Sequence, residues 1–274
     1  MGIDTTLANA PTPMLESPLP RQVLGEMYQS MVRARLLEQR IRGTAHTGEA
    51  ILAGALPNIE ADDVIVAAES HPVLQVLCGA DIASWLKPQP STRKKDGLSG
   101  IEESRVVIAG LQSAIAIAAG LALAQKRINS SAITVAILTG KSTKNGLWEE
   151  ATNFASERRV PLVIIADWTE GRSGRSHEGR DLSRWPMPTI AVDGRDVIAV
   201  YRVIKEAISS ARKGHGPTLV DCVNFVAPGT RGKEERDPVS SFRGYLKRHN
   251  AWSDDYLAIE ESLRKELGVT GRRR

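Results

Sequence analysis

The residues most able to do chemistry lie in the segment 139–146, which reads Thr-Gly-Lys-Ser-Thr-Lys-Asn-Gly. Gly140, Lys141 and Ser142 have the types found at the end of a phosphate-binding loop, where backbone amides and a lysine hold phosphate. That motif also needs a glycine five positions before Gly140, and Val135 stands there instead. The nucleotide-binding motif is therefore incomplete, and a tight turn with solvated lysines is the simplest interpretation.

Lys141 and Lys144 nevertheless stand just before a predicted helix, where the helix macrodipole favours acids rather than cations. An anionic small molecule, such as a phosphate or a carboxylate held by the turn, would account for both lysines. The alternative is that both side chains point into solvent. The candidate ligand-binding residues are Gly140, Lys141, Ser142, Thr143, Lys144 and Asp167.

The segments around this turn predict an α/β domain with a parallel sheet. Strands are expected at 132–138, 160–166, 188–192 and 217–225, with a strand or a helix start at 62–68. Helices are expected at 21–42, 48–56, 105–126, 145–158, 195–213 and 253–267, the last between an N-cap at Ser253 and a stop at Gly268. Apolar strands that alternate with helices indicate a sheet covered on both faces. Ligands of such sheets bind beyond the carboxyl ends of the strands, here after Leu138 and Ala166.

The domain organisation follows from composition. Residues 1–20 contain several prolines and predict a flexible N-terminal arm, and 21–274 shows no internal repeat and no clean linker, which favours one domain. A polar loop is expected at 88–102. The apolar run 106–124 has the length of a membrane span, but its many alanines and glycines and its central Gln112 favour a buried helix.

Charge and cysteine content exclude several classes of protein. Lys plus Arg is 36 against 32 for Asp plus Glu, a net charge of +4. The acids and bases interleave along the chain, so nucleic-acid binding is not expected. Cys78 and Cys222 are far apart and outside any zinc-ligand spacing, which favours a reducing compartment, the cytoplasm.

Several segments resemble one known family. Residues 147–155 (Leu-Trp-Glu-Glu-Ala-Thr-Asn-Phe-Ala), followed by 160–165, resemble the E1 alpha subunit of thiamine-diphosphate-dependent 2-oxo acid dehydrogenases, which shows Glu-Ala-Leu-Asn-Phe-Ala and then Leu-Pro-Val. Residues 192–197 are similar to its Val-Asp-Gly-Asn-Asp-Val, and 214–219 to its Gly-x-Gly-Pro-Thr-Leu. The resemblance spans residues 21–268 in order. It implies a single domain of the thiamine-diphosphate-binding type, with a parallel sheet and helices on both faces.

The family's metal site is altered in this chain. The resemblance implies that Mg²⁺ and thiamine diphosphate bind through Gly-Asp-Gly, an Asn on the next helix turn and an Asn pair after the next strand. Here 139–141 reads Thr-Gly-Lys, Lys144 takes the first Asn position, and Trp168 and Thr169 replace the pair. Mg²⁺ requires oxygen ligands, which an ammonium group cannot supply.

Two other family motifs also differ. The cofactor-contacting Tyr-Arg-x-His-Gly corresponds to 68–72, where Glu69 replaces the arginine. The Arg-Gly-His-Ser loop corresponds to 227–230, which has no histidine. We therefore expect no family catalytic residue, no metal and no bound thiamine diphosphate.

Three functions stay open at this point. The expected one is an E1 alpha-like protein without the ancestral activity, a pseudoenzyme that pairs with a beta-type partner subunit or forms a homo-oligomer. The second is an active thiamine-dependent 2-oxo acid decarboxylase or dehydrogenase with a rebuilt site. The third is a metal-free binder of another anionic ligand. No membrane partner is expected.

Overall fold

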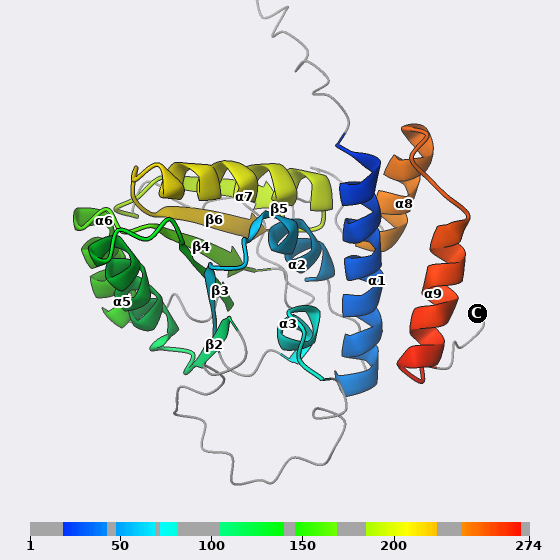
Figure 1. The fold of residues 1–274 in the computed structure, drawn as a ribbon, viewed down its shortest axis with the longest axis horizontal. Coiled ribbons are helices and arrows are strands. Elements are labelled where there is room, and N and C mark those ends of the chain that lie inside the picture. Colours follow the sequence, from blue (N-terminus) through cyan, green and yellow to red (C-terminus); the bar gives the residue numbers. More distant parts are fainter. Residues whose placement is uncertain are drawn as a thin grey trace, which may run out of the picture.

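A six-stranded parallel sheet organises the chain (Figure 1). The computed structural model describes residues 19–42, 48–68, 72–81, 105–139, 146–168, 185–223 and 237–269. The strands run in the order β2-β1-β3-β4-β6-β5, and every neighbouring pair is parallel. Their bounds are β1 Val64–Ala68, β2 Val106–Ala109, β3 Thr134–Thr139, β4 Leu162–Asp167, β5 Thr189–Asp193 and β6 Thr218–Val223. The predicted fold class is confirmed.

Helices cover the two faces of this sheet, as predicted. One face packs against α5 (Ala114–Arg127) and α6 (Gly146–Glu157), and the other against α1 (Arg21–Arg42), α2 (Glu49–Ala55) and α7 (Val197–Arg212). Strand side chains alternate between the two cores. In β4, Ile164 belongs to the α5 and α6 side, while Val163 and Ile165 belong to the α1 and α7 side. Both faces are buried, which explains why most strand side chains are apolar.

The prediction of one helix over 105–126 is wrong. Its first part is strand β2 (Val106–Ala109), and the helix α5 begins only at Ala114. A turn separates them, in which the backbone N–H of Ala114 donates to the carbonyl of Gly110 at 2.9 Å. The strand and the helix are both apolar, and Gly110, Gln112 and the N-cap Ser113 between them were the available signal for the boundary. Within the described ranges, no helix combines the length and apolar character needed to cross a bilayer.

Three further elements were not predicted: α3 (Pro72–Leu77), the 3₁₀ turn Leu56–Asn58 and α8 (Pro238–Arg248). The N-cap of the last helix also differs from the predicted one. The last helix, α9, spans Asp255–Glu266 with Asp254 rather than Ser253 at its N-cap, although Ser253 Oγ accepts a bond from the Asp255 N–H. Gly268 ends it with φ of +61°, as expected for a glycine stop.

Helices α1, α8 and α9 lie side by side at one end of the sheet (Figure 1). Aromatic rings join them: the Tyr28 ring lies 5.4 Å from that of Trp252 and 5.0 Å from that of Tyr256. The Tyr28 hydroxyl accepts from Arg243 at 2.8 Å and donates to Glu260. Burial, helped by the bond to Glu260, raises the pKa of Tyr28 to about 12. The tyrosine therefore stays neutral and anchors the C-terminal helices to α1.

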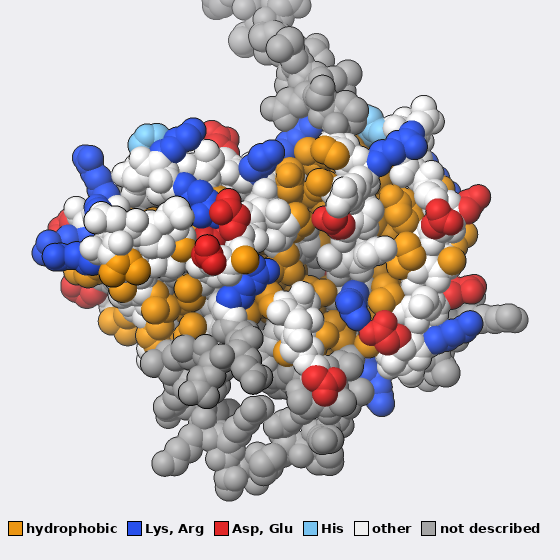
Figure 2. Space-filling view, in the orientation of Figure 1, with side chains coloured by type: hydrophobic (Ala, Val, Ile, Leu, Met, Phe, Trp, Pro, Cys, Tyr) orange, Lys and Arg blue, Asp and Glu red, His pale blue; other side chains and the backbone are white. Residues whose placement is uncertain are grey.

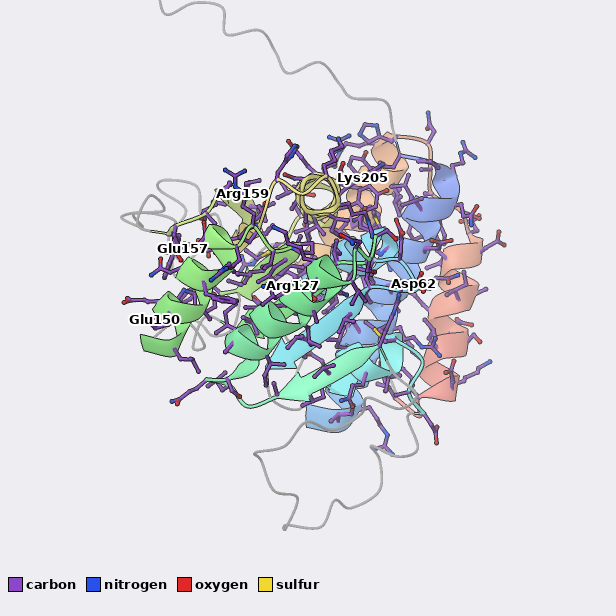
Figure 3. All side chains as sticks on the ribbon, turned by 60° about the vertical axis from the view of Figure 1, so that its left-hand side comes forward. Asp62, Arg127, Glu150, Glu157, Arg159 and Lys205 are labelled. Carbon is purple, nitrogen blue, oxygen red and sulfur yellow. The ribbon has the colours of Figure 1, made fainter. Side chains whose placement is uncertain are left out.

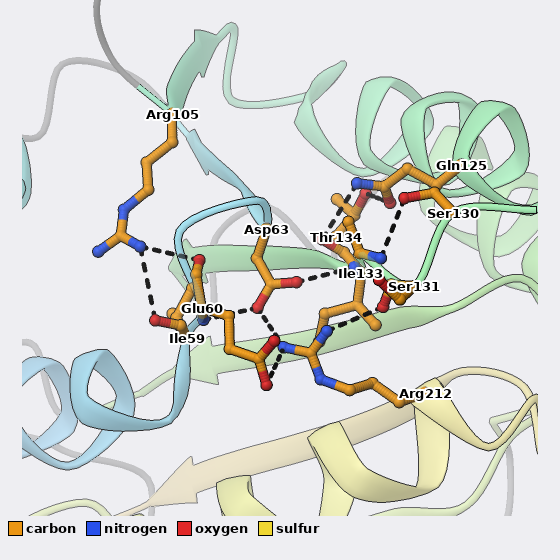
Figure 4. Close-up of polar contacts among 11 residues, drawn as sticks. Ile59, Glu60, Asp63, Arg105, Gln125, Ser130, Ser131, Ile133, Thr134 and Arg212 are labelled. Atoms are coloured by element: carbon orange, nitrogen blue, oxygen red, sulfur yellow. Dashed lines mark hydrogen bonds and ion pairs between the residues drawn. The ribbon is translucent and has the colours of Figure 1, made fainter. Parts of the chain in front are cut away.

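The buried carboxylate of Asp63 joins three segments at the amino end of the sheet (Figure 4). It accepts from the backbone N–H of Ile133 at 2.9 Å, just before β3, and from that of Glu60 at 2.8 Å. Arg212, at the end of α7, donates to it at 2.6 Å and to the Ser131 carbonyl at 2.9 Å. The start of β1, the start of β3 and the end of α7 are thereby fixed together.

Replacing Asp63 with alanine should lower the free energy of unfolding by about 3–5 kcal/mol, because two N–H groups and Arg212 lose a buried partner. Urea denaturation measures the change. Asp62→Ala is the matched control: its neighbouring carboxylate is exposed, and its effect should stay within about 0.5 kcal/mol. Equal effects of the two substitutions would contradict the role given to Asp63.

Candidate functional site

The candidate site lies at the carboxyl edge of the sheet, where β3 and β4 end next to each other. Thr139 and Asp167 are the last residues of these strands and are partners in the sheet register. Of the six predicted ligand-binding residues, Asp167 is described, and it is half-buried at this edge. The other five, Gly140, Lys141, Ser142, Thr143 and Lys144, lie outside the described residues. Their contacts with an anion stay a prediction.

The carboxylate of Asp167 points toward the start of α2. A methyl group added at Gly48 would lie 3.1 Å from Asp167 Oδ2, closer than ordinary van der Waals contact allows. The absence of a side chain at residue 48 therefore allows this close approach of the helix to the strand end. This contact brings a second segment, far away in the sequence, to the edge that the two strands form.

Several acids surround this part of the sheet. Cys222 in β6 is fully buried, and burial raises the pKa of its thiol well above the usual range. The charges of Asp167, Asp221 and Asp193 raise that pKa further. The thiol therefore stays protonated and unreactive at neutral pH. The described side of the edge carries negative charge, which disfavours a second anion there.

The sequence did not lead us to predict the ion pair between Arg35 and the buried Glu49. Glu49, in the first turn of α2, is 3% exposed and accepts a hydrogen bond from Arg35 Nε at 3.1 Å. The same guanidinium contacts Asp237 Oδ1 at 2.6 Å, and Asp237 caps α8 by accepting from the Ser240 N–H. One arginine thus holds the starts of two helices. A glutamate inside the apolar segment 48–56 was the available signal for it.

The two carboxylates beside Arg35 differ in pKa. Burial raises the pKa of Glu49, and the nearby Arg35 only partly offsets this; one of its oxygens, Oε2, is buried without a hydrogen-bond partner among the described residues. Burial would also raise the pKa of Asp237, but hydrogen bonds from Arg35 and Ser240 lower it overall. The guanidinium therefore stabilises the Asp237 charge more than that of Glu49.

Of the positions that the family resemblance assigns to Mg²⁺ and diphosphate, the structure describes Thr139 and Trp168. Trp168 stands where the family has an asparagine, directly after β4; its backbone N–H donates to the Cys222 carbonyl at 3.0 Å. Its indole packs against the core cluster beneath α5 and α6. An indole has no oxygen to offer a metal. In the described part of the chain, no group of three His, Cys, Asp or Glu side chains can hold a metal ion.

The other replaced motifs cannot be placed in the same way. Glu69, His71 and residues 227–230 lie outside the described residues, as does Thr169. The prediction that these positions no longer serve the family's cofactor therefore stays a prediction.

The strand order and the helix layers are consistent with an α/β protein of the thiamine-diphosphate-binding type of fold. Residues 61–259 match the dehydrogenase E1 component family, and the chain belongs to that family. The predicted likeness to E1 alpha subunits is confirmed.

Three relatives illustrate that likeness. The chain is 26% identical to the pyruvate dehydrogenase E1 component subunit alpha of Acholeplasma laidlawii, over 93% of this chain and 85% of that protein. It is 29% identical to the 3-methyl-2-oxobutanoate dehydrogenase subunit alpha of Mycobacterium tuberculosis H37Rv, over 91% and 78%. It is 24% identical to the 2-oxoisovalerate dehydrogenase subunit alpha of Bacillus subtilis, over 88% and 86%.

Replacing Glu49 with glutamine should change how stability depends on pH. The pKa of Glu49 is raised above its usual 4.5 in the folded chain, so the folded state binds this proton more tightly than the unfolded state. The free energy of unfolding therefore falls as the pH rises from 4.5 through the folded pKa. Glutamine does not titrate, so the variant should lose less stability than the wild type between pH 4.5 and pH 7.

Urea denaturation at several pH values tests this, with Glu266→Gln as the control. Glu266 also pairs with an arginine of α1, Arg33 at 2.6 Å, but its side chain is 47% exposed, whereas that of Glu49 is buried. The control should follow the wild-type pH profile closely. A Glu49→Gln profile parallel to the wild type would show that Glu49 has the same pKa in the folded and unfolded chains.

Proposed function

We propose that this protein is an alpha-type subunit of a 2-oxo acid dehydrogenase-like assembly that has kept the family fold and lost Mg²⁺–thiamine diphosphate chemistry. The observation that carries the proposal is the packing of Trp168. A side chain that contributes to the apolar core replaces an oxygen donor, so the change is built into the packing of the sheet. The replacements at Gly140, Lys144 and Glu69 point in the same direction.

The proposal extends to partners. The relatives are named as alpha subunits of dehydrogenases, which supports a beta-type partner or a second copy of this chain. The outer side of α5 offers a surface for it: Ile117 and Leu121 are half-exposed, and Gly120 and Ala124 are exposed. Figure 2 shows hydrophobic side chains gathered over this part of the molecule. Small residues there permit close approach of another helix. We place the protein in the cytoplasm, where its two free thiols stay reduced.

Thiamine diphosphate with Mg²⁺ should not bind to the purified protein. Isothermal titration calorimetry with both ligands is expected to give no saturable heat, because Lys144 and Trp168 stand where the family has oxygen ligands for the metal. Inorganic phosphate without Mg²⁺ is the second titrant. Binding of phosphate that is weakened by the double substitution Lys141→Ala and Lys144→Ala would favour the metal-free anion binder instead.

A Mg²⁺-dependent dissociation constant in the micromolar range would contradict the proposal and favour an active enzyme with a rebuilt site. Gly140→Asp with Lys144→Asn serves as a gain-of-function control. We expect at most weak Mg²⁺ binding in that variant, because Trp168 and Glu69 remain.

The protein should form oligomers with itself or with a beta-type subunit. Sedimentation velocity at micromolar concentration should show a species larger than one chain, and Leu121→Glu with Ala124→Glu should shift it toward the monomer. Leu257→Glu on α9 is the control, since this residue is also an exposed leucine, at 47%. A wild type that sediments as a monomer, both alone and with a beta-type subunit, would remove this part of the proposal.

A further inference from the structure

Three helices end at the amino edge of the sheet, opposite the candidate site. The last residues of α5, α6 and α7 are Arg127, Glu157 and Arg212, and the strands that follow start at this same edge. Figure 3 labels Arg127, Glu157 and Arg159, which come from the ends of α5 and α6. This edge belongs to neither the candidate site nor the outer side of α5.

Five cations gather there, and together they are called the basic edge: Lys126, Arg127, Arg158, Arg159 and Lys213. All five are exposed, and none forms an ion pair with a carboxylate in the described ranges. Arg212 is excluded from this set because Asp63 at 2.6 Å and Glu60 at 3.2 Å already neutralise it. The acidic turn that contains these two residues borders the basic edge on one side.

Direct contacts join the segments that carry the basic edge. The ammonium group of Lys126 donates to the carbonyl oxygens of Arg158 at 2.6 Å and of Arg159 at 3.2 Å. A methyl group at Gly216 would lie 3.3 Å from the Arg159 Cα, so the stem of this arginine rests on the chain just after Lys213. The ends of all three helices therefore contribute to one surface.

Helix electrostatics explain only part of this charge. Cations near a helix C-terminus interact favourably with the macrodipole, which accounts for Lys126 and Arg127 in the last turn of α5. Arg159 lies beyond the end of α6 and has φ of +46°, a conformation that favours glycine. An arginine at this position is strained and makes no ion pair with the described carboxylates. A requirement for charge at the surface would account for it.

Apolar side chains interrupt the basic edge. Ile128 follows Arg127 and is 75% exposed, and Phe154 is 37% exposed with the Arg158 guanidinium 6.0 Å from its ring centroid. Exposed isoleucine and phenylalanine beside arginines are typical of protein–protein contact surfaces. Charge alone would not require them.

We propose that the basic edge is a docking surface for an acidic polypeptide segment that also carries apolar residues. Carboxylates of the segment pair with Arg127, Arg158 and Arg159, whose guanidinium groups can bind a carboxylate through two hydrogen bonds. Leucine-like side chains of the segment cover Ile128 and Phe154. The segment binds on the edge remote from Asp167, so docking leaves the candidate site accessible.

The same features disfavour a nucleic acid as the partner. Glu157 lies among the cations, next to Arg158, and would repel a phosphate backbone that follows the surface. A polypeptide can place a neutral or basic residue at that point. A duplex also offers no apolar surface along its backbone for Ile128.

Fluorescence anisotropy with three labelled probes tests the proposal: an oligoglutamate, a peptide of equal length with the repeat Glu-Glu-Leu, and a DNA duplex. The Glu-Glu-Leu peptide should bind most tightly although it carries fewer charges. The triple substitution Arg127→Ser, Arg158→Ser and Arg159→Gly should weaken its binding about tenfold or more, equivalent to roughly 1.4 kcal/mol. Ile128→Ser should weaken binding of the Glu-Glu-Leu peptide and leave binding of the oligoglutamate unchanged.

The matched control is Arg40→Ser, Arg248→Ser and Lys265→Ser, which removes three exposed cations outside the basic edge. It should leave peptide binding unchanged. An equal loss of peptide affinity in both triple variants would show that net charge alone causes the effect, and it would overturn the proposal. Tightest binding of the duplex would overturn it in favour of a nucleic acid. A triple variant that unfolds at lower temperature but binds the peptide normally would assign these cations to helix stabilisation alone.

Discussion

The burial of both faces of the parallel sheet is the constraint on which the rest of the structure depends. With helix layers on either side, the buried strand positions are mostly apolar, as Val163, Ile164 and Ile165 show in β4, and Asp221 inside β6 is an exception. Most polar groups of the sheet therefore lie at the two edges where strands begin and end. The candidate site lies at one of these edges, and the basic edge lies at the other.

The two edges have opposite character. The carboxyl edge is rich in carboxylates, with Asp167 and Asp193 at strand ends and Glu49 buried nearby. The amino edge carries the unpaired cations at the ends of α5, α6 and α7. Helix direction accounts for part of this contrast. A helix that runs antiparallel to the strands brings its partial negative end to the amino edge, where it attracts cations.

Much of the fold could be predicted from sequence because its periodic signals are strong. The β-branched runs that became β3 and β4, and the one-sided apolar pattern of α7, indicate their elements without reference to neighbours. The boundary between β2 and α5 was missed, since the short polar break at Gln112 and Ser113 divides two apolar segments that together have the length of one helix. Asp167, by contrast, could be assigned to the site because it follows a predicted strand. The cluster of Arg35, Glu49 and Asp237 could not be predicted, because only the packing of α1 brings its three segments together.

The Asp63 contact has a consequence for how the chain is made. Its partners are a backbone amide at residue 133 and a guanidinium at residue 212 of a 274-residue chain. During synthesis, the first three strands emerge from the ribosome while this carboxylate still lacks its cation. The amino edge thus cannot close over Asp63 until α7 has been translated. Asp63 thus gains its last partner only after about three quarters of the chain has been translated, so the amino edge of the sheet is completed late.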